Sequence, residues 1–168
     1  MTGGSIRPAY PAWPLLHRQL RRVVEGLNDE RLLLKPEPDR WPMWATIGHL
    51  ACQRVFGLCD FAGEPGAETT PFTNAAYNCP GDDDLVNVLT SSQLVAALDS
   101  TYAIIDRVLD TWTLDSLDEV LRRPEWDDSW VRTRGELIQR TYAHDVWHCA
   151  ELNDTLSRNA LPLIDIWE

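Results

Sequence analysis

The chain has 168 residues and a formal net charge of -11. This length is sufficient to bury a hydrophobic core without disulfides, so we expect residues 1–168 to form a single domain. The negative charge repels phosphate backbones, which argues against a nucleic-acid-binding protein.

The N-terminal segment, residues 1–12, is rich in Gly and Pro and predicts an irregular lead-in. It lacks the apolar run of a signal peptide, and no segment is apolar enough to predict a transmembrane helix. We therefore expect a cytoplasmic protein without a membrane partner. Because that compartment is reducing, we expect free thiols, although an even number of cysteines would permit disulfides in a secreted protein. The cysteines are Cys52, Cys59, Cys79 and Cys149.

The first predicted helix covers residues 14–28, where apolar residues recur every three or four positions and arginines occupy the other side. His17 lies beside this apolar stripe, and we interpret it as a surface histidine because an isolated histidine seldom has a special role. Residues 29–43 contain three prolines and a charge cluster, and they predict a loop.

The second predicted helix covers residues 44–63 and is apolar nearly all round, which predicts a central, well-covered element. Gly63 is a typical helix stop. We expect His49 to lie inside the bundle because it belongs to this helix. One face of the helix carries Thr46, His49, Gln53, Phe56 and Asp60.

A long connection rich in Pro, Asn, Gly and Asp follows, residues 64–89, with one short helical turn expected near residues 85–89. A connection of this length either covers a functional pocket or is a mobile acidic loop. Both interpretations remain open on the sequence alone.

A third helix is predicted from Thr90 to Trp112. Thr90 and Gln93 have the spacing of a capping box, and apolar residues follow at helical intervals. Residues 113–132 are polar, contain tryptophans and connect this helix to the last one.

The last predicted helix covers residues 133–158 and carries two histidines, His144 and His148. Thr133 and Glu136 predict a capping box at its start. Four helical residues turn through about 400° and rise about 6 Å, so the two imidazoles leave the same face one turn apart. This spacing allows two histidines on one helix to bind a single metal ion.

Four amphipathic helices without an alternating strand pattern predict an all-α protein, a four-helix bundle with long connecting loops. Such bundles build metal sites from side chains that project inward from facing helices. Two histidines leave a metal short of ligands, and His49 is the third candidate. Three neutral imidazoles favour zinc, with nickel, cobalt or iron as alternatives set by availability, and Cys52 is a reserve ligand. The alternative is that hydrogen bonds satisfy the histidines inside the core.

The residues around these histidines resemble the DinB/YfiT-like superfamily of metal-binding four-helix bundles. The segment WPMWATIGHL, residues 41–50, leads into a helix with His49, and YAHDVWHCAELNDTLSRNALP, residues 142–162, carries the H-x-x-x-H pair. Each motif is short, so the specificity of the resemblance comes from their combination. It implies an up-down-down-up bundle with a metal held by His49, His144 and His148, and it suggests a homodimer.

The superfamily includes S-transferases that use mycothiol or bacillithiol, and a mycothiol-dependent maleylpyruvate isomerase. The resemblance therefore implies a metal-dependent transferase that joins a low-molecular-weight thiol, of mycothiol, bacillithiol or glutathione type, to an electrophile. Gln53 could hydrogen-bond a bound water or thiol, and Glu151 could orient His148, although both could equally be ordinary polar residues. Three tryptophans could line the pocket mouth or belong to the core, namely Trp44, Trp130 and Trp147.

Two other functions remain open. HDVWH differs from the H-E-x-x-H metalloprotease motif by Asp145 in place of Glu, but the shorter side chain and the lack of a later histidine disfavour a hydrolase. We interpret Asp145 as a solvated carboxylate or as one that supports a ligand. The other alternative is a non-catalytic metal-binding module of a stress response, with the acidic loop as a partner surface.

Overall fold

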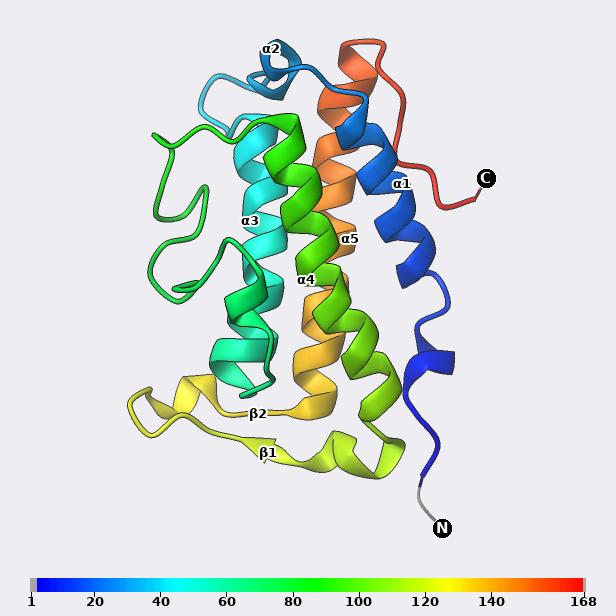
Figure 1. Cartoon of the computed structure of the whole chain (residues 1–168), viewed down its shortest axis with the longest axis vertical. Helices are drawn as coiled ribbons and strands as arrows, with labels where there is room; N and C mark the ends of the chain where they lie inside the picture. The colour runs from blue at the N-terminus through cyan, green and yellow to red at the C-terminus, as the bar shows by residue number, and fades with distance from the viewer. Residues whose placement is uncertain (1–2, 168) are drawn as a thin grey trace.

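The computed structural model describes residues 3–167. Within this part of the chain four long helices form a bundle, which confirms the predicted all-α architecture (Figure 1). None of the helices in residues 3–167 is long and apolar enough to cross a membrane. The long helices are α1 (Trp13–Glu25), α3 (Met43–Val55), α4 (Ser91–Thr111) and α5 (Arg134–Arg158), and the short helix α2 (Asp29–Leu32) follows α1.

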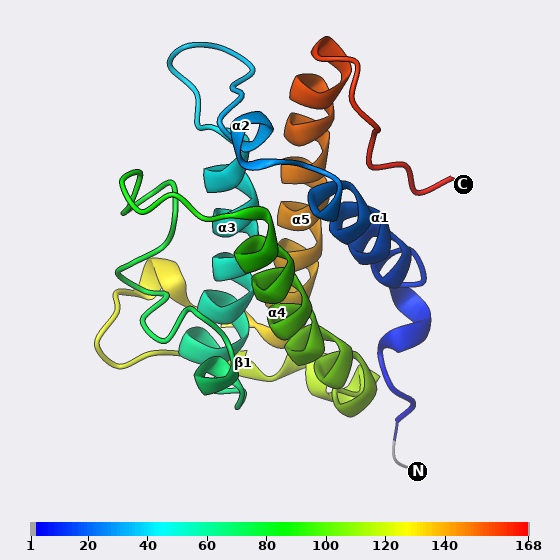
Figure 2. The same ribbon diagram turned by 45° about the horizontal axis from the view of Figure 1, so that its top comes forward.

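The long helices follow the up-down-down-up order. In Figure 1, α1 and α5 run upward whereas α3 and α4 run downward, so the consecutive helices α3 and α4 are parallel. Parallel neighbours need a long crossover, and the long connection between them supplies it along one side of the bundle. The turned view in Figure 2 shows α4 between α1 and α3, and α3 packs against both α4 and α5.

Each long helix contributes fully buried side chains to one shared core. Trp13, Leu50, Leu98 and Ile138 come from α1, α3, α4 and α5 in turn, and none of them is exposed. Burial of an apolar side chain of this size contributes about 1.5–3 kcal/mol, so this core fixes α3 and α5 relative to each other. These are the two helices that carry the candidate metal ligands.

The predicted capping boxes at the starts of α4 and α5 are present. Thr90 and Thr133 each accept a hydrogen bond from the backbone N–H three residues later, and the side chains of Gln93 and Glu136 return to the cap. The second predicted helix is not a continuous α-helix to its end. After α3, the chain winds into a π-helical turn, η2 (Phe56–Phe61), where an extra residue per turn re-aims the side chains.

The connections contain more regular structure than the sequence predicts. The expected loop after α1 includes α2, which begins because Asn28 caps it with its side chain. The polar segment before α5 forms a small antiparallel hairpin between β1 (Val120–Leu121) and β2 (Arg132–Thr133). Strands of two residues are too short for alternation to be visible in the sequence. Three short 3-10 helices also lie in connections, namely η3 (Ala67–Thr69), η4 (Leu114–Asp118) and η5 (Asp128–Trp130), and no helical turn forms at residues 85–89.

The interpretation of His17 as a surface residue is wrong. Its side chain is buried in the bundle, and its ring stacks on Tyr102 of α4 with centroids 3.9 Å apart and planes 3° from parallel. The inward stripe of α1 is wider than the apolar residues alone suggest, because the aromatic partner on α4 covers the imidazole.

The expectation of four free thiols is also wrong. Cys52 of α3 and Cys79 of the long connection form a disulfide, whereas Cys59 and Cys149 are free and buried. The connection folds back over α3 and brings the two Cα atoms within 5.8 Å, the usual range for a disulfide. Because its sulfur is bonded to Cys79, Cys52 is not available as the reserve metal ligand.

Candidate metal centre

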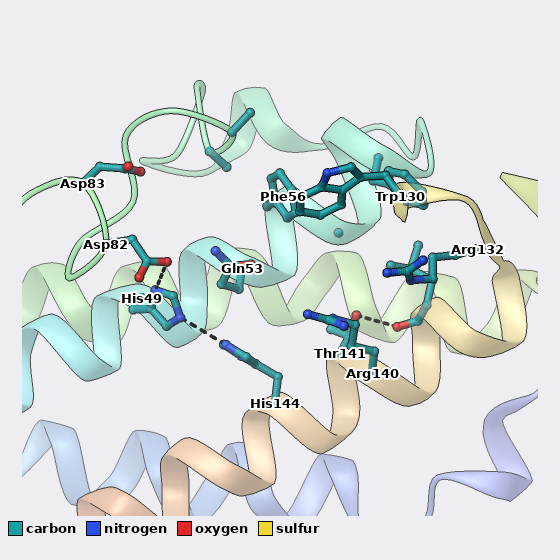
Figure 3. Close-up of a pocket in the computed structure, with 15 residues that line it drawn as sticks. His49, Gln53, Phe56, Asp82, Asp83, Trp130, Arg132, Arg140, Thr141 and His144 are labelled. Carbon is teal, nitrogen blue, oxygen red and sulfur yellow. Dashed lines mark hydrogen bonds and ion pairs between the residues drawn. The ribbon is translucent and has the colours of Figure 1, made fainter. Parts of the chain in front are cut away.

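Three imidazoles from two helices meet at one point of the bundle. His49 comes from α3, and His144 and His148 come from successive turns of α5. The Nε2 atom of His144 lies 3.1 Å from Nε2 of His49 and 3.1 Å from Nε2 of His148. Among the described residues these three offer nitrogen atoms that all lie within 4.8 Å of one another. Figure 3 shows the rings of His49 and His144 directed toward each other across the gap between the helices.

The arrangement of these nitrogens fits a divalent metal better than hydrogen bonding. A neutral imidazole nitrogen offers either one N–H or one lone pair, so the His144 Nε2 can form a well-aligned hydrogen bond with only one of its two neighbours. Nitrogens that each lie ~2.1 Å from one zinc ion are ~3.4 Å apart at the tetrahedral angle. The observed separations of 3.1 Å are close to that value. The three rings therefore form a preformed donor set with one side free for a further ligand.

The outward ring nitrogens of two histidines face carboxylates. The Nδ1 of His148 lies 2.7 Å from Oε2 of Glu151, which accepts a hydrogen bond from it. With its proton held at Nδ1, a neutral His148 presents a lone pair at Nε2, toward the other rings. Asp82, from the long connection, places Oδ2 3.3 Å from Nδ1 of His49, although the alignment falls short of a hydrogen bond. Both carboxylates favour the tautomer that leaves Nε2 free for a metal.

Burial keeps the rings of His144 and His49 neutral, which is the form that binds metals. Burial lowers the pKa of His144 to about 3, and electrostatic repulsion from the neighbouring His148 and His49 acts in the same direction. Burial also lowers the pKa of His49, against the opposing effect of Asp82. A neutral ring keeps its lone pair, so protons do not compete with a metal near neutral pH.

Asp145 is not the solvated or ligand-supporting carboxylate that the sequence suggested. Its side chain is 1% exposed, and Oδ2 lies 2.8 Å from Nη2 of Arg54 on α3. Trp13 of α1 donates its indole N–H to the same carboxylate at 2.7 Å. Since Asp145 follows His144 on the helix, it points toward the bundle centre while His144 points toward α3. Its role is to join three helices behind the histidines.

A cavity of about 380 Å³ opens beside the histidines. His49 and His144 line one part of it, and Gln53 projects into it from the turn after His49 (Figure 3). Trp130 lies in its wall. The long connection contributes Ala75, Ala76, Asp82 and Asp83 to the lining, so it lies over the cavity. This position agrees with the interpretation of the connection as the cover of a pocket.

A second cavity of about 720 Å³ lies on the other side of His148. Glu151 and Trp147 line it, and the Trp147 side chain is 67% exposed. Trp44 lines neither cavity: it is 2% exposed and belongs to the core, because it begins α3 on the face turned into the bundle. The pocket-mouth prediction for Trp44 is therefore wrong.

Sequence reasoning missed several residues that line the site. Trp41 places its ring 4.9 Å from the ring of His49, centroid to centroid, and Asp82 approaches the same histidine. Arg132 of β2 and Arg140 of α5 line the first cavity. Arg140 is four residues before His144, a spacing that could have placed it on the same helix face. Trp41 begins the segment WPMWATIGHL, which leads into the His49 helix, whereas the positions of Asp82 and Arg132 depend on how connections fold back and have no local signal.

Comparisons with known proteins agree with this fold. The model of the DinB superfamily matches residues 15–152, so the chain belongs to the DinB superfamily. The fold is similar to the crystal structure of a DinB-like protein from Bacillus cereus ATCC 10987, with a TM-score of 0.69 and 12% sequence identity over 97% of each chain. No curated protein matches the chain. At 12% identity, the likeness to the solved structure concerns the fold alone.

Proposed function

We propose that this DinB-superfamily protein binds one divalent metal, zinc or nickel, through His49, His144 and His148. We further propose that it acts as a transferase that joins a low-molecular-weight thiol to a small electrophile. The observation that supports the proposal best is the convergence of three imidazole Nε2 atoms beside an open cavity, with that of His144 3.1 Å from each of the other two. Three protein ligands and one free position are typical of catalytic rather than structural zinc sites.

When bound, a divalent metal supplies Lewis acidity, which lowers the pKa of a thiol and favours the nucleophilic thiolate. The chain's own residues hold and shape this site. Glu151 fixes the orientation of the His148 ring through Nδ1. Gln53 projects its amide into the cavity and can hydrogen-bond a ligand there. The aromatic side chains of Phe56 and Trp130 exclude water from the cavity wall.

Two alternatives lead to different results. A non-catalytic metal-binding module of a stress response would hold the metal without any thiol-dependent turnover. A hydrolase of the H-E-x-x-H type would need an acid at position 145 that faces the metal. Asp145 instead pairs with Arg54 inside the core, so it cannot act as the general base of a hydrolase.

The proposal is tested with a panel of thiols. Metal-loaded chain is mixed with mycothiol, bacillithiol or glutathione and the electrophile monochlorobimane, and adduct fluorescence is followed. Thiol-dependent turnover that His49→Ala abolishes supports the transferase. Stoichiometric metal binding without turnover for any thiol favours the non-catalytic module, and peptide hydrolysis without thiol favours the hydrolase. We also propose that the chain forms a homodimer, which size-exclusion chromatography with light scattering tests on the same preparation.

A further inference from the structure

The cavity beside the histidines has two ends of opposite charge. At one end, Asp82 lies beside His49 with Asp83 farther out on the same connection, whereas Arg132 lies on the side of Trp130 and Arg140 lies beside Thr141, between Arg132 and His144 (Figure 3). The two arginines come from different elements, β2 and the second turn of α5, and converge on the same space because the hairpin folds against the start of α5.

Arg132 and Arg140 differ from the other arginines of this region. Arg122, Arg123 and Arg134 each lie within 4.0 Å of a carboxylate. For Arg132 and Arg140, the described residues supply no carboxylate within that distance. Arg132 turns Nη1 to the backbone carbonyls of Ser129 and Val131, which holds the side chain in place and leaves Nη2 free.

Two unpaired guanidinium groups in one cavity are a recognition element for an anion. The whole chain carries a net charge of -11, so a local pair of cations stands out against its surface. The planar guanidinium fork matches the two oxygens of a carboxylate and binds it through parallel charge-assisted hydrogen bonds. The acidic end of the cavity repels the same group, so an anionic ligand has one preferred orientation.

We propose that this cavity binds a small ligand that carries a carboxylate, with the carboxylate held by Arg132 and Arg140 and the rest of the ligand directed toward the histidines. This inference rests on the proposed function, because it names the chemical class of the thiol or electrophile. Phe56 and Trp130, whose ring centroids lie 5.8 Å apart, form an apolar wall for the body of the ligand. The cavity volume of about 380 Å³ suits a small molecule rather than a peptide.

The carboxylate site is tested first without any metal. Binding of benzoate and of benzamide, which differ in charge but hardly in shape, is measured on the full metal-free chain by calorimetry and by Trp fluorescence. We expect benzoate to bind about tenfold more tightly than benzamide, and Arg140→Gln to remove that difference. Arg140 is the better variant because it forms no hydrogen bond that supports the fold among the described residues, whereas Arg132 holds two backbone carbonyls.

Arg22→Gln is the matched control. Arg22 is exposed on α1 and lines neither cavity. Its substitution removes the same charge as Arg140→Gln, so it should leave the benzoate preference unchanged. Circular dichroism confirms that each variant is folded. Equal binding of benzoate and benzamide by the unmodified chain would overturn the inference. A preference that Arg140→Gln retains, or that Arg22→Gln also removes, would overturn it as well.

The source of the carboxylate is determined with the metal-loaded chain. One arm compares 3-mercaptopropionate with its amide, each with the neutral electrophile monochlorobimane. The other compares 4-(bromomethyl)benzoate with its amide, each with the neutral thiol 2-mercaptoethanol. If the acid is preferred to its amide in the first arm, and Arg140→Gln abolishes the preference, the thiol carries the carboxylate. If this happens in the second arm, the electrophile carries it. In each arm the amide and its partner are both neutral, and turnover of these neutral combinations tests the proposed function by itself. Binding of benzoate to the metal-free chain tests the carboxylate site by itself.

Discussion

Arg54 of α3 and Asp145 of α5 form an ion pair in the centre of the bundle, with Nη2 and Oδ2 2.8 Å apart and both side chains 1% exposed. Asp145 follows His144 on α5, and Arg54 also donates to Thr101 of α4. Each buried charge is stabilised only by its partner and these hydrogen bonds. The pair therefore holds together the helices that carry the histidines.

Removing one member of this pair should destabilise the fold strongly. We expect Asp145→Asn to lower the free energy of unfolding by about 3–5 kcal/mol, because the guanidinium of Arg54 is left buried without a counter-charge. The measurement is a urea titration followed by circular dichroism. Asp154→Asn, which removes an exposed partner of Arg158 on the same helix, is the control and should change the free energy by less than about 1 kcal/mol. Similar losses for both variants would show that the buried pair has no special role.

Glu151 should tune the metal affinity rather than the fold. Its carboxylate accepts a hydrogen bond from His148 and is partly exposed, so Glu151→Gln keeps the shape but weakens the orientation of the ring. We expect a fall in zinc affinity of about 10–100-fold, measured by competition with a chromophoric chelator. The thermal midpoint of the metal-free chain should stay unchanged. An unchanged affinity would mean that Glu151 is an ordinary surface residue.

His17 should make the stability depend on pH. Burial lowers its pKa to about 4, with Arg54 acting in the same direction and Asp99 opposing. Between pH 6.5 and 4 the unfolded chain binds a proton at this position that the folded chain does not, so stability falls as the pH falls through this window. The contribution is about 3 kcal/mol, and it is complete above pH 6.5 and lost near pH 4.

The pH effect is isolated with His17→Gln. The difference in free energy of unfolding between the unmodified chain and this variant should decrease as the pH is lowered from 7 to 4, in metal-free protein. Urea titrations at several pH values give that difference. A difference that stays constant across this range would contradict the buried, neutral histidine.

The disulfide between Cys52 and Cys79 should stabilise the long connection. The two cysteines are separated by 27 positions, and closing a loop of this size contributes about 3.5 kcal/mol by the chain-entropy estimate. We expect Cys79→Ser, or a reductant, to lower the thermal midpoint and to increase hydrogen exchange in residues 64–89. Cys59→Ala, at a free buried cysteine, keeps the disulfide and should retain the dependence on reductant, whereas Cys79→Ser should lose it. An unmodified chain with the same midpoint in oxidised and reduced form would contradict the bond.

The four long helices could be predicted from the sequence because their signals are local. Apolar spacing and capping residues such as Thr90 and Thr133 lie within the segments that they define. The order of the bundle came from the resemblance to a family, whereas His49 was chosen as the third ligand because it belongs to the helix that is apolar nearly all round. The histidine pair of α5 was the strongest local signal for the site, because four-residue spacing fixes the shared face.

The remaining features depend on contacts between distant segments. Cys79 reaches Cys52, and Asp82 reaches His49, only because the long connection folds back over α3. The burial of Asp145 depends on Arg54, which is 91 positions away in the chain. A charged residue next to a candidate metal ligand looks like part of the site in the sequence, but the helix turns adjacent side chains about 100° apart.

The central claim is that His49, His144 and His148 bind one metal ion together. X-ray absorption spectroscopy on chain purified without a histidine tag and loaded with zinc tests it most directly. We expect about one zinc per chain and a first shell that includes three imidazoles at ~2.0–2.1 Å, with one imidazole lost in His49→Ala. A metal content far below one per chain, or a shell without imidazole that His49→Ala does not change, would contradict the account.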